Sequence, residues 1–86
     1  LVRGADNDEA RQQAAQRQQI TNLQEQVRAR LTRLERSSLS AEERRMAEDA
    51  RTFLSQSDRA LAGNDFQRAM NLARKASMLV AVVEQQ

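Results

Sequence analysis

Two pairs of adjacent carboxylates are the residues best suited to acid–base or metal chemistry, namely Glu42 with Glu43 and Glu48 with Asp49. An acid–base pair or a two-metal site needs carboxylates that converge on one cleft. Adjacent residues on a helix point about 100° apart, and arginines are interspersed with both pairs. The pattern therefore predicts a solvated surface with salt bridges and not a catalytic site.

The remaining residue types argue against most other kinds of catalytic site. The chain contains neither His nor Cys, which removes the usual general base, thiolate chemistry and the commonest metal ligands. Its six serines have no histidine to activate them, and its two isolated glycines cannot form a phosphate-binding loop. We therefore expect no enzyme, no cofactor, no bound metal and no small-molecule substrate.

Arginines concentrate in the segment 11–36, which holds six Arg and two Glu. A local excess of positive charge is a common signature of a surface that binds nucleic acid or another polyanion. Helical geometry spreads these side chains around the segment, however, and no aromatic residue lies among them to stack on bases. Nucleic-acid binding is therefore the alternative function, and its candidate anion-binding residues are Arg28, Arg30, Arg33 and Arg36.

The elements that position these side chains are expected to be helices. The 86 residues include 14 Ala, 13 Arg and 11 Gln, with no Pro and only two Gly, and this composition favours helix over sheet. A chain of this length forms one domain with a small core, and it has no apolar run long enough to span a membrane. Since residue 1 is Leu and not Met, we expect a fragment or a processed product.

The first predicted helix covers residues 8–36 and follows a frayed lead-in at residues 1–7. Apolar residues recur every three or four positions within a stripe about 80° wide. So narrow a stripe is typical of a coiled-coil seam or of a helix that packs on one partner. The stripe consists of Ile20, Leu23, Val27, Leu31 and Leu34.

The same stripe becomes polar when it is extended towards the N-terminus. It passes through Gln16, Gln13 and Glu9, so the first three turns have no apolar face on that side. Two interpretations stay open. The segment is either a solvated or frayed helical extension, or a polar coiled-coil arm that docks on a partner.

Cap and turn residues delimit two further helices, at 41–61 and 65–84. Ser40 and Glu43 have the spacing of a capping box. Gly63 is expected to take the left-handed conformation that ends many helices, and Asn64 or Asp65 can then cap the last helix.

The end of the last helix is apolar nearly all round, from Met78 to Val83. Such a helix should be covered on more than one side. Val82 points away from the main apolar band, so it is a candidate contact between chains.

Phe53 and Phe66 lie on either side of the predicted turn at Gly63, and Ser57, Ala69 and Ala76 are small residues at helical spacing. With this pattern, residues 50–83 resemble a single tetratricopeptide-repeat (TPR) hairpin, in which an aromatic residue packs at the turn and small residues let two helices approach. The resemblance implies an antiparallel hairpin that serves as a scaffold. No Pro closes the unit and no second repeat follows. The residues expected to pack the hairpin are Phe53, Ser57, Gly63, Phe66, Ala69, Ala73 and Ala76. The segment is also similar to helical hairpins of uncharacterised bacterial envelope lipoproteins, which favours a cell envelope or periplasm over the cytoplasm.

Together these patterns predict an all-α unit in which a long first helix packs on a TPR-like hairpin. We expect a non-catalytic protein-interaction or assembly module whose partners are proteins, including further copies of itself. The candidates for self-association or partner binding are Ile20, Leu23, Val27, Leu31, Leu34, Leu79, Val80, Val82 and Val83. Some of them must also form the core within one chain, and the sequence does not divide the two roles.

Overall fold

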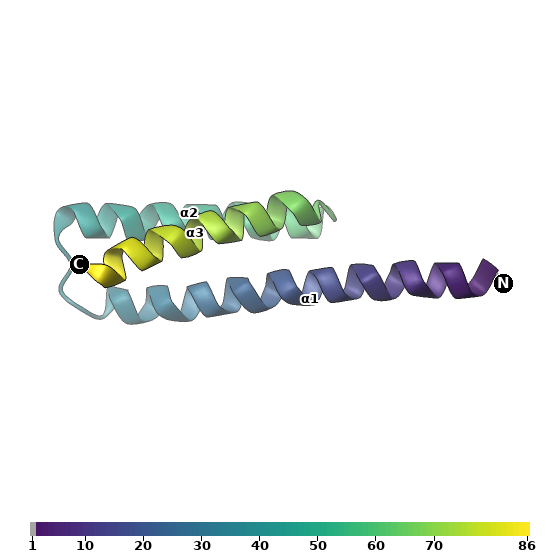
Figure 1. The fold of residues 1–86 in the computed structure, drawn as a ribbon. Helices are drawn as coiled ribbons and strands as arrows, with labels where there is room; N and C mark the ends of the chain where they lie inside the picture. Colours follow the sequence, from purple (N-terminus) through teal and green to yellow (C-terminus); the bar gives the residue numbers. More distant parts are fainter. Residues whose placement is uncertain (1) are drawn as a thin grey trace.

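Three α-helices make up the protein in the computed structural model, which describes residues 2–86 and, from residue 8 onward, their side chains. The helices are α1 (Val2–Glu35), α2 (Ala41–Ala62) and α3 (Phe66–Gln85). Residues 2–86 include no strand. α2 and α3 form an antiparallel hairpin, and α1 lies along it (Figure 1). The predicted all-α arrangement is confirmed, and α2 and α3 begin and end within one residue of their predicted bounds.

The first helix is longer than predicted at its N-terminal end. α1 begins at Val2, whereas the sequence pattern placed a lead-in at residues 1–7 and the helix start near residue 8. A single Gly4 costs a helix only about 1 kcal/mol, and the run from Glu9 to Gln19, rich in Ala, Arg and Gln, favours a helix that extends back through residues 2–7. Leu1 and the side chains of residues 2–7 lie outside the described part of the chain.

The start of α2 has the predicted capping box. The Ser40 hydroxyl accepts a hydrogen bond from the Glu43 amide at 3.1 Å, and the Glu43 carboxylate accepts one from the Ser40 amide at 2.9 Å. These bonds satisfy two backbone amides near the start of the helix that lack an intrahelical acceptor. Leu39, directly before the cap, packs against the core, so both the polar and the apolar signals of this helix start are realised.

The turn between α2 and α3 differs from the prediction in which residue is left-handed. Gly63 has φ −86°, and the left-handed residue is Asn64, with φ 62°. The Asn64 amide donates to Leu61 O and the Asp65 amide donates to Ala60 O, the hydrogen-bond pattern of a Schellman motif with Asn64 at C′. The helix therefore continues one residue further than expected, since Asn tolerates this conformation. Asp65 caps α3 as predicted, accepting from the Arg68 amide.

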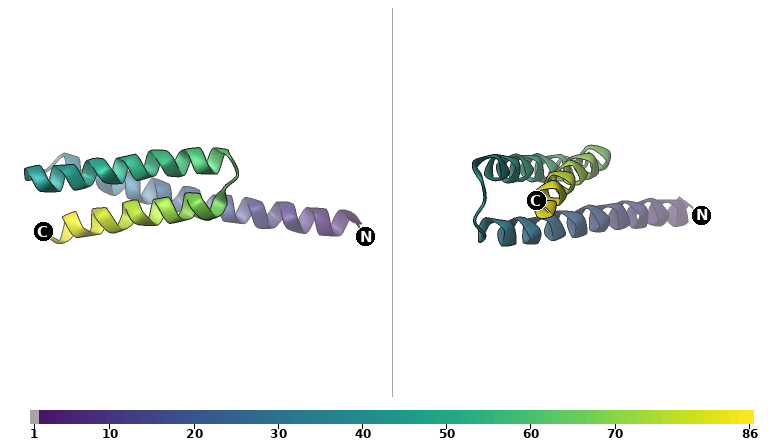
Figure 2. Two further views of the ribbon diagram at one scale, coloured as in Figure 1. Left: turned by 90° about the horizontal axis from the view of Figure 1, so that it is seen from above. Right: turned by 60° about the vertical axis from the view of Figure 1, so that its left-hand side comes forward.

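Small residues bring the helices of the hairpin together. Ala50, Ala69, Ala73 and Ala76 are fully buried, and small side chains let neighbouring helix axes approach closely. α1 completes the core with its C-terminal half, and the molecule measures 59 × 17 × 16 Å. Figure 2 shows α1 continuing past the turn of the hairpin towards its own N-terminus. None of the described helices is long and apolar enough to cross a lipid bilayer.

Candidate interaction surfaces

Most of the residues predicted to mediate self-association pack within one chain. Five of the nine are at most 3% exposed, and three more are half-buried against the same core. Val82 differs, because 41% of it is exposed. The buried set is Ile20, Val27, Leu31, Val80 and Val83, and the half-buried set is Leu23, Leu34 and Leu79. The structure thus assigns these residues to the core of the three-helix unit and leaves Val82 at its surface.

Val82 has one large apolar neighbour on its exposed face. Met78 precedes it by four residues, which places both on the same side of α3, and Met78 is 68% exposed. Two exposed apolar side chains are fewer than a protein interface normally contains. This patch therefore does not define a docking surface by itself.

The residues predicted to pack the hairpin divide into a buried set and an edge set. Ser57, Ala69, Ala73 and Ala76 are fully buried. Phe53 and Phe66 are half-buried at the edges of the core, and Gly63 is exposed in the turn. Each aromatic ring also has a cationic group over it. Lys75 Nζ lies 5.8 Å from the centre of the Phe53 ring, and the Arg17 guanidinium carbon lies 5.2 Å from the centre of the Phe66 ring.

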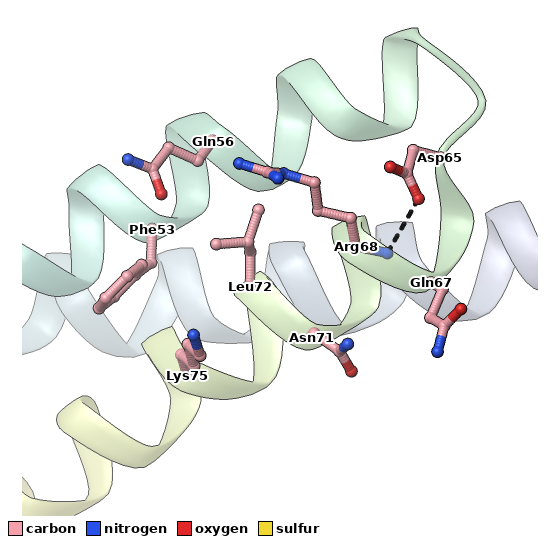
Figure 3. A pocket seen from close by; sticks show the side chains of 8 residues that line it. All are labelled: Phe53, Gln56, Asp65, Gln67, Arg68, Asn71, Leu72 and Lys75. Atoms are coloured by element: carbon pink, nitrogen blue, oxygen red, sulfur yellow. Dashed lines mark hydrogen bonds between the residues drawn. The ribbon is translucent and has the colours of Figure 1, made fainter.

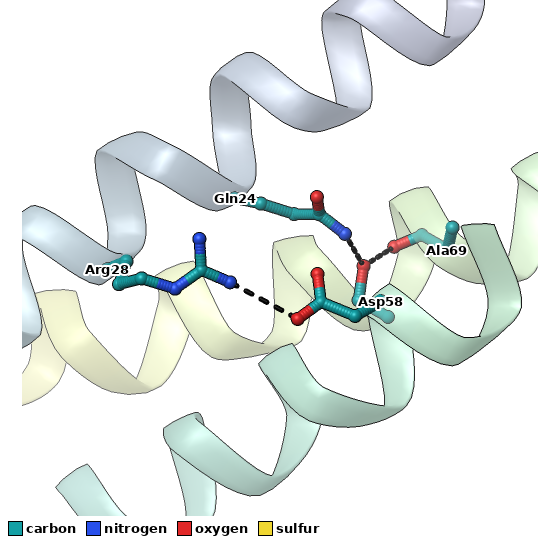
Figure 4. A network of polar contacts seen from close by, with 5 residues as sticks. Gln24, Arg28, Asp58 and Ala69 are labelled. Carbon is teal, nitrogen blue, oxygen red and sulfur yellow. Dashed lines mark hydrogen bonds and ion pairs between the residues drawn. The ribbon is translucent and has the colours of Figure 1, made fainter. Parts of the chain in front are cut away.

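A buried polar junction ties all three helices together (Figure 4). Gln24 of α1, only 4% exposed, donates to the Ser57 hydroxyl of α2 at 2.8 Å. That hydroxyl donates in turn to the backbone carbonyl of Ala69 in α3 at 2.6 Å. Sequence reasoning missed Gln24, although it follows Ile20 by four residues and precedes Val27 by three, a spacing that places it on the apolar stripe.

Two of the four candidate anion-binding arginines are engaged within the chain. Arg30 contacts both carboxylate oxygens of Glu84 in α3, at 2.6 and 3.1 Å, and Arg28 pairs with Asp58 of α2 at 3.2 Å. Hydrogen bonding from Arg30 holds the pKa of Glu84 below its ordinary value. Arg28 thus points towards α2 and Arg30 towards α3, whereas Arg33 and Arg36 are exposed, so the four side chains do not share one basic face.

A second two-pronged ion pair joins α1 to α2. Arg51 donates to both carboxylate oxygens of Glu35, and these hydrogen bonds lower the pKa of that carboxyl. The three ion pairs of the described side chains, those of Arg28, Arg30 and Arg51, therefore all connect the C-terminal half of α1 to the hairpin. They orient α1 along the hairpin, and the charges of these three arginines are paired within the chain.

The acidic pairs Glu42–Glu43 and Glu48–Asp49 remain at the surface of α2. Glu43 is engaged in the capping box, and the other three side chains are exposed. No group of three or more acidic side chains among residues 8–86 is arranged to hold a metal ion.

Residues 8–19 of α1 form the longest run of exposed side chains in the described part of the chain. Every side chain from Asp8 to Gln19 is exposed, and burial begins abruptly at Ile20, which is 1% exposed. We call residues 8–19 the arm. At 1.5 Å per residue the arm is about 18 Å long, and most of it extends past the turn of the hairpin (Figure 1).

Arg17 fastens the inner end of the arm to the turn of the hairpin. Its guanidinium donates to Leu61 O, at 3.4 Å, and to Asn64 Oδ1, besides its contact with the Phe66 ring. The carbonyls at a helix C-terminus and the left-handed Asn64 thus receive a positively charged partner. Nothing in the sequence pattern distinguishes Arg17 from the other arginines of this helix, so this contact is visible only in the structure.

Two open grooves flank α3. One, of about 500 Å³, lies between α2 and α3 and includes Phe53, Leu72 and Lys75 (Figure 3). The other, of about 460 Å³, lies between α1 and α3 where the arm meets the hairpin. We call it the arm groove; it is lined by Gln16, Gln19, Ile20, Phe66, Gln67, Met70, Asn71 and Arg74. Four of these side chains are amides, three are apolar and one is the cation of Arg74.

Comparison with known proteins gives no further guide to these surfaces, because no protein-family model, curated protein or solved structure matches this chain.

Proposed function

We propose that this chain is a non-catalytic helical interaction module that binds its protein partner through the arm. The observation that carries the proposal is the exposure of every side chain of a twelve-residue helical segment, from Asp8 to Gln19. As an extension of a packed helix the arm needs no nucleation of its own, but it frays without further contacts, because most helical stability in proteins comes from tertiary packing. A partner helix would supply that packing.

The hairpin supports the proposal as a rigid base for the arm. Fully buried Ala69, Ala73 and Ala76 bring α2 and α3 close together, as the resemblance to a TPR hairpin implies for a scaffold. Arg17 joins the arm to this base at the turn. The inner end of the arm is therefore held in a fixed direction, and the side chains of its outer end remain exposed.

Nucleic-acid binding has weaker support. Arg28 and Arg30 already contact the carboxylates of Asp58 and Glu84, so a phosphate backbone would have to displace them. Binding that depends on phosphate contacts weakens steeply with salt, and a titration with DNA and RNA at low salt checks this alternative.

Site-specific photo-cross-linking in cells that produce the chain tests the proposal. A photoreactive residue at Gln13, in the middle of the arm, should give a discrete cross-linked species. The matched control is Thr52, which is exposed on α2 and should give none. An absent adduct at Gln13, or the same adducts from both positions, would contradict the proposal.

A further inference from the structure

We propose that the partner of the arm is a second copy of this chain, bound antiparallel, with the arm of each copy entering the arm groove of the other. This inference rests on the proposed function and names the occupant of the surface. It follows from the order of charges along the arm, from its polar seam and from the lining of the groove.

The arm is acidic at its outer end and basic further in. Its only charged residues are Asp8 and Glu9, followed by Arg11 and Arg17. None of the four has an ion-pair partner among the described side chains, and Arg17 donates only to the neutral acceptors Leu61 O and Asn64 Oδ1. Two arms side by side in the same direction would place acid against acid. Two arms in opposite directions place the acidic end of each against Arg17 of the other.

The seam of the arm sets the register of such a pair. Glu9, Gln13 and Gln16 continue the heptad-like spacing of the buried stripe of α1. Pairing about Gln13 aligns Glu9 of one copy with Arg17 of its partner, because both are four residues from the centre. The Gln13 amide carries both a donor and an acceptor, so the two Gln13 side chains can pair with one another across the two-fold axis.

The arm groove receives the outer end of the arm in this register. Asp8 of one copy reaches the level of Gln18 of its partner, beside the groove lined by Gln16, Gln19 and Arg74. Arg74 has no ion-pair partner among the described side chains, so the groove offers a positive charge to the acidic end. The groove lies between α1 and α3, and none of the turn residues 63–65 is among those that line it.

Charge variants test the pairing. Glu9→Arg and Arg17→Glu should each weaken dimerisation about tenfold or more, because each places like charges together in both halves of the dimer. An equimolar mixture of the two variants should restore dimerisation, since every contact is then complementary again. Sedimentation equilibrium measures all three samples. Thermal melting of each variant checks the fold, because Arg17 also contacts the turn. A mixture that dimerises no better than either variant alone would overturn the proposal.

Single-cysteine variants test the direction of the pair in a chain that has no other Cys. Two Gln13→Cys side chains meet at the two-fold axis, where the Cα atoms of closely packed helices are about 4–5 Å apart, and a disulfide should form. Two Gln16→Cys residues are offset by about 9 Å along the helices and should not link. Ala15→Cys, on the opposite face of the arm, is the control for random collision.

Each remaining outcome overturns the antiparallel dimer. Linking at both Gln13 and Gln16 indicates parallel arms, and linking at neither position in a monomeric sample indicates that the arms do not pair. If the photo-cross-link at Gln13 joins a different protein, the interaction module stands while the second copy is excluded. If that cross-link is absent as well, both proposals fail.

Discussion

The two halves of α1 have similar helix-forming residues and opposite surroundings. From Ile20 onward the helix buries an apolar stripe and the amide of Gln24, and three ion pairs connect this half or its end to the hairpin. From Asp8 to Gln19 it buries no side chain. The comparison shows that helix propensity alone extends an element beyond its tertiary contacts.

The largest difference in stability between the two halves of α1 should come from truncation of a core side chain. Leu31 is fully buried, so Leu31→Ala should lower the free energy of unfolding by about 2–5 kcal/mol through lost burial and the cavity left behind. Gln13→Ala in the arm should change it by less than about 0.5 kcal/mol in dilute protein. Chemical denaturation measures both. Equal destabilisation by the two changes would contradict the division of α1.

The buried polar junction should give the next largest effect. Ser57→Ala removes the acceptor of Gln24 Nε2 and the donor to Ala69 O, and a buried amide without a partner costs about 1–3 kcal/mol. The double variant Gln24→Leu with Ser57→Ala replaces both partners with apolar groups, so it should regain much of that loss. If the loss of unfolding free energy in the double variant equals the sum of the losses in Ser57→Ala and Gln24→Leu alone, the two side chains do not depend on each other.

At the turn, where the arm meets the hairpin, substitutions at two neighbouring residues should have different effects on stability. Asn64→Ala should cost about 1–2 kcal/mol, because alanine disfavours the left-handed conformation at φ 62° and the contact with Arg17 is lost. Gly63→Ala should be neutral or stabilise by up to about 1 kcal/mol, since Gly63 has an ordinary φ of −86° and an added Cβ would lie 3.6 Å from the nearest atom. Thermal melting of both variants checks the order, and a more damaging change at Gly63 would reverse the assignment of the turn.

The ion pairs of the inner half should give a small dependence of stability on pH. Hydrogen bonds from arginines lower the pKa of Glu35 and Glu84 below the ordinary value of 4.5. A carboxyl whose pKa is lower in the folded state contributes stability above its unfolded pKa, and this contribution is lost as the pH falls through the folded value. The partially exposed pairs contribute less than about 1 kcal/mol each.

The unfolding free energy should therefore be nearly constant from about pH 8 to about pH 5.5, since the chain contains no His, and should decrease below about pH 4.5. A variant with Glu35→Gln and Glu84→Gln should show a shallower decrease. Glu25→Gln, at an exposed site on α1 with no ion pair among the described side chains, is the matched control. The same decrease in all three proteins would exclude these ion pairs as its source.

The local signals of the sequence predicted most of the fold. The capping box at Ser40 and Glu43, the cap at Asp65 and the stripe from Ile20 to Leu34 depend on neighbouring residues, and the sequence displays such spacing directly. Gly63 misled the prediction of the turn, because glycine is the commonest left-handed residue but Asn64 also tolerates that conformation.

The candidate surfaces were less predictable, because they depend on contacts between residues far apart in the chain. The pattern identified Leu31 and Val80 as apolar but did not show that one chain suffices to bury them. Arg17 and Arg30 contact residues 44 and 54 positions away, and no local pattern marks their partners. The sequence showed the polar seam at Gln13 and Gln16. It did not show where the hairpin ends beside α1, which depends on the lengths of α2 and α3.

Amide hydrogen exchange along α1 tests the division of this helix most directly. In protein diluted until it is monomeric, amides from Val27 to Leu34 should exchange only through opening of the whole fold, while those from Gln12 to Gln16 should exchange many times faster through local fraying. Equal protection of the two segments in the monomer would contradict the account, because the arm would then be stabilised without a partner.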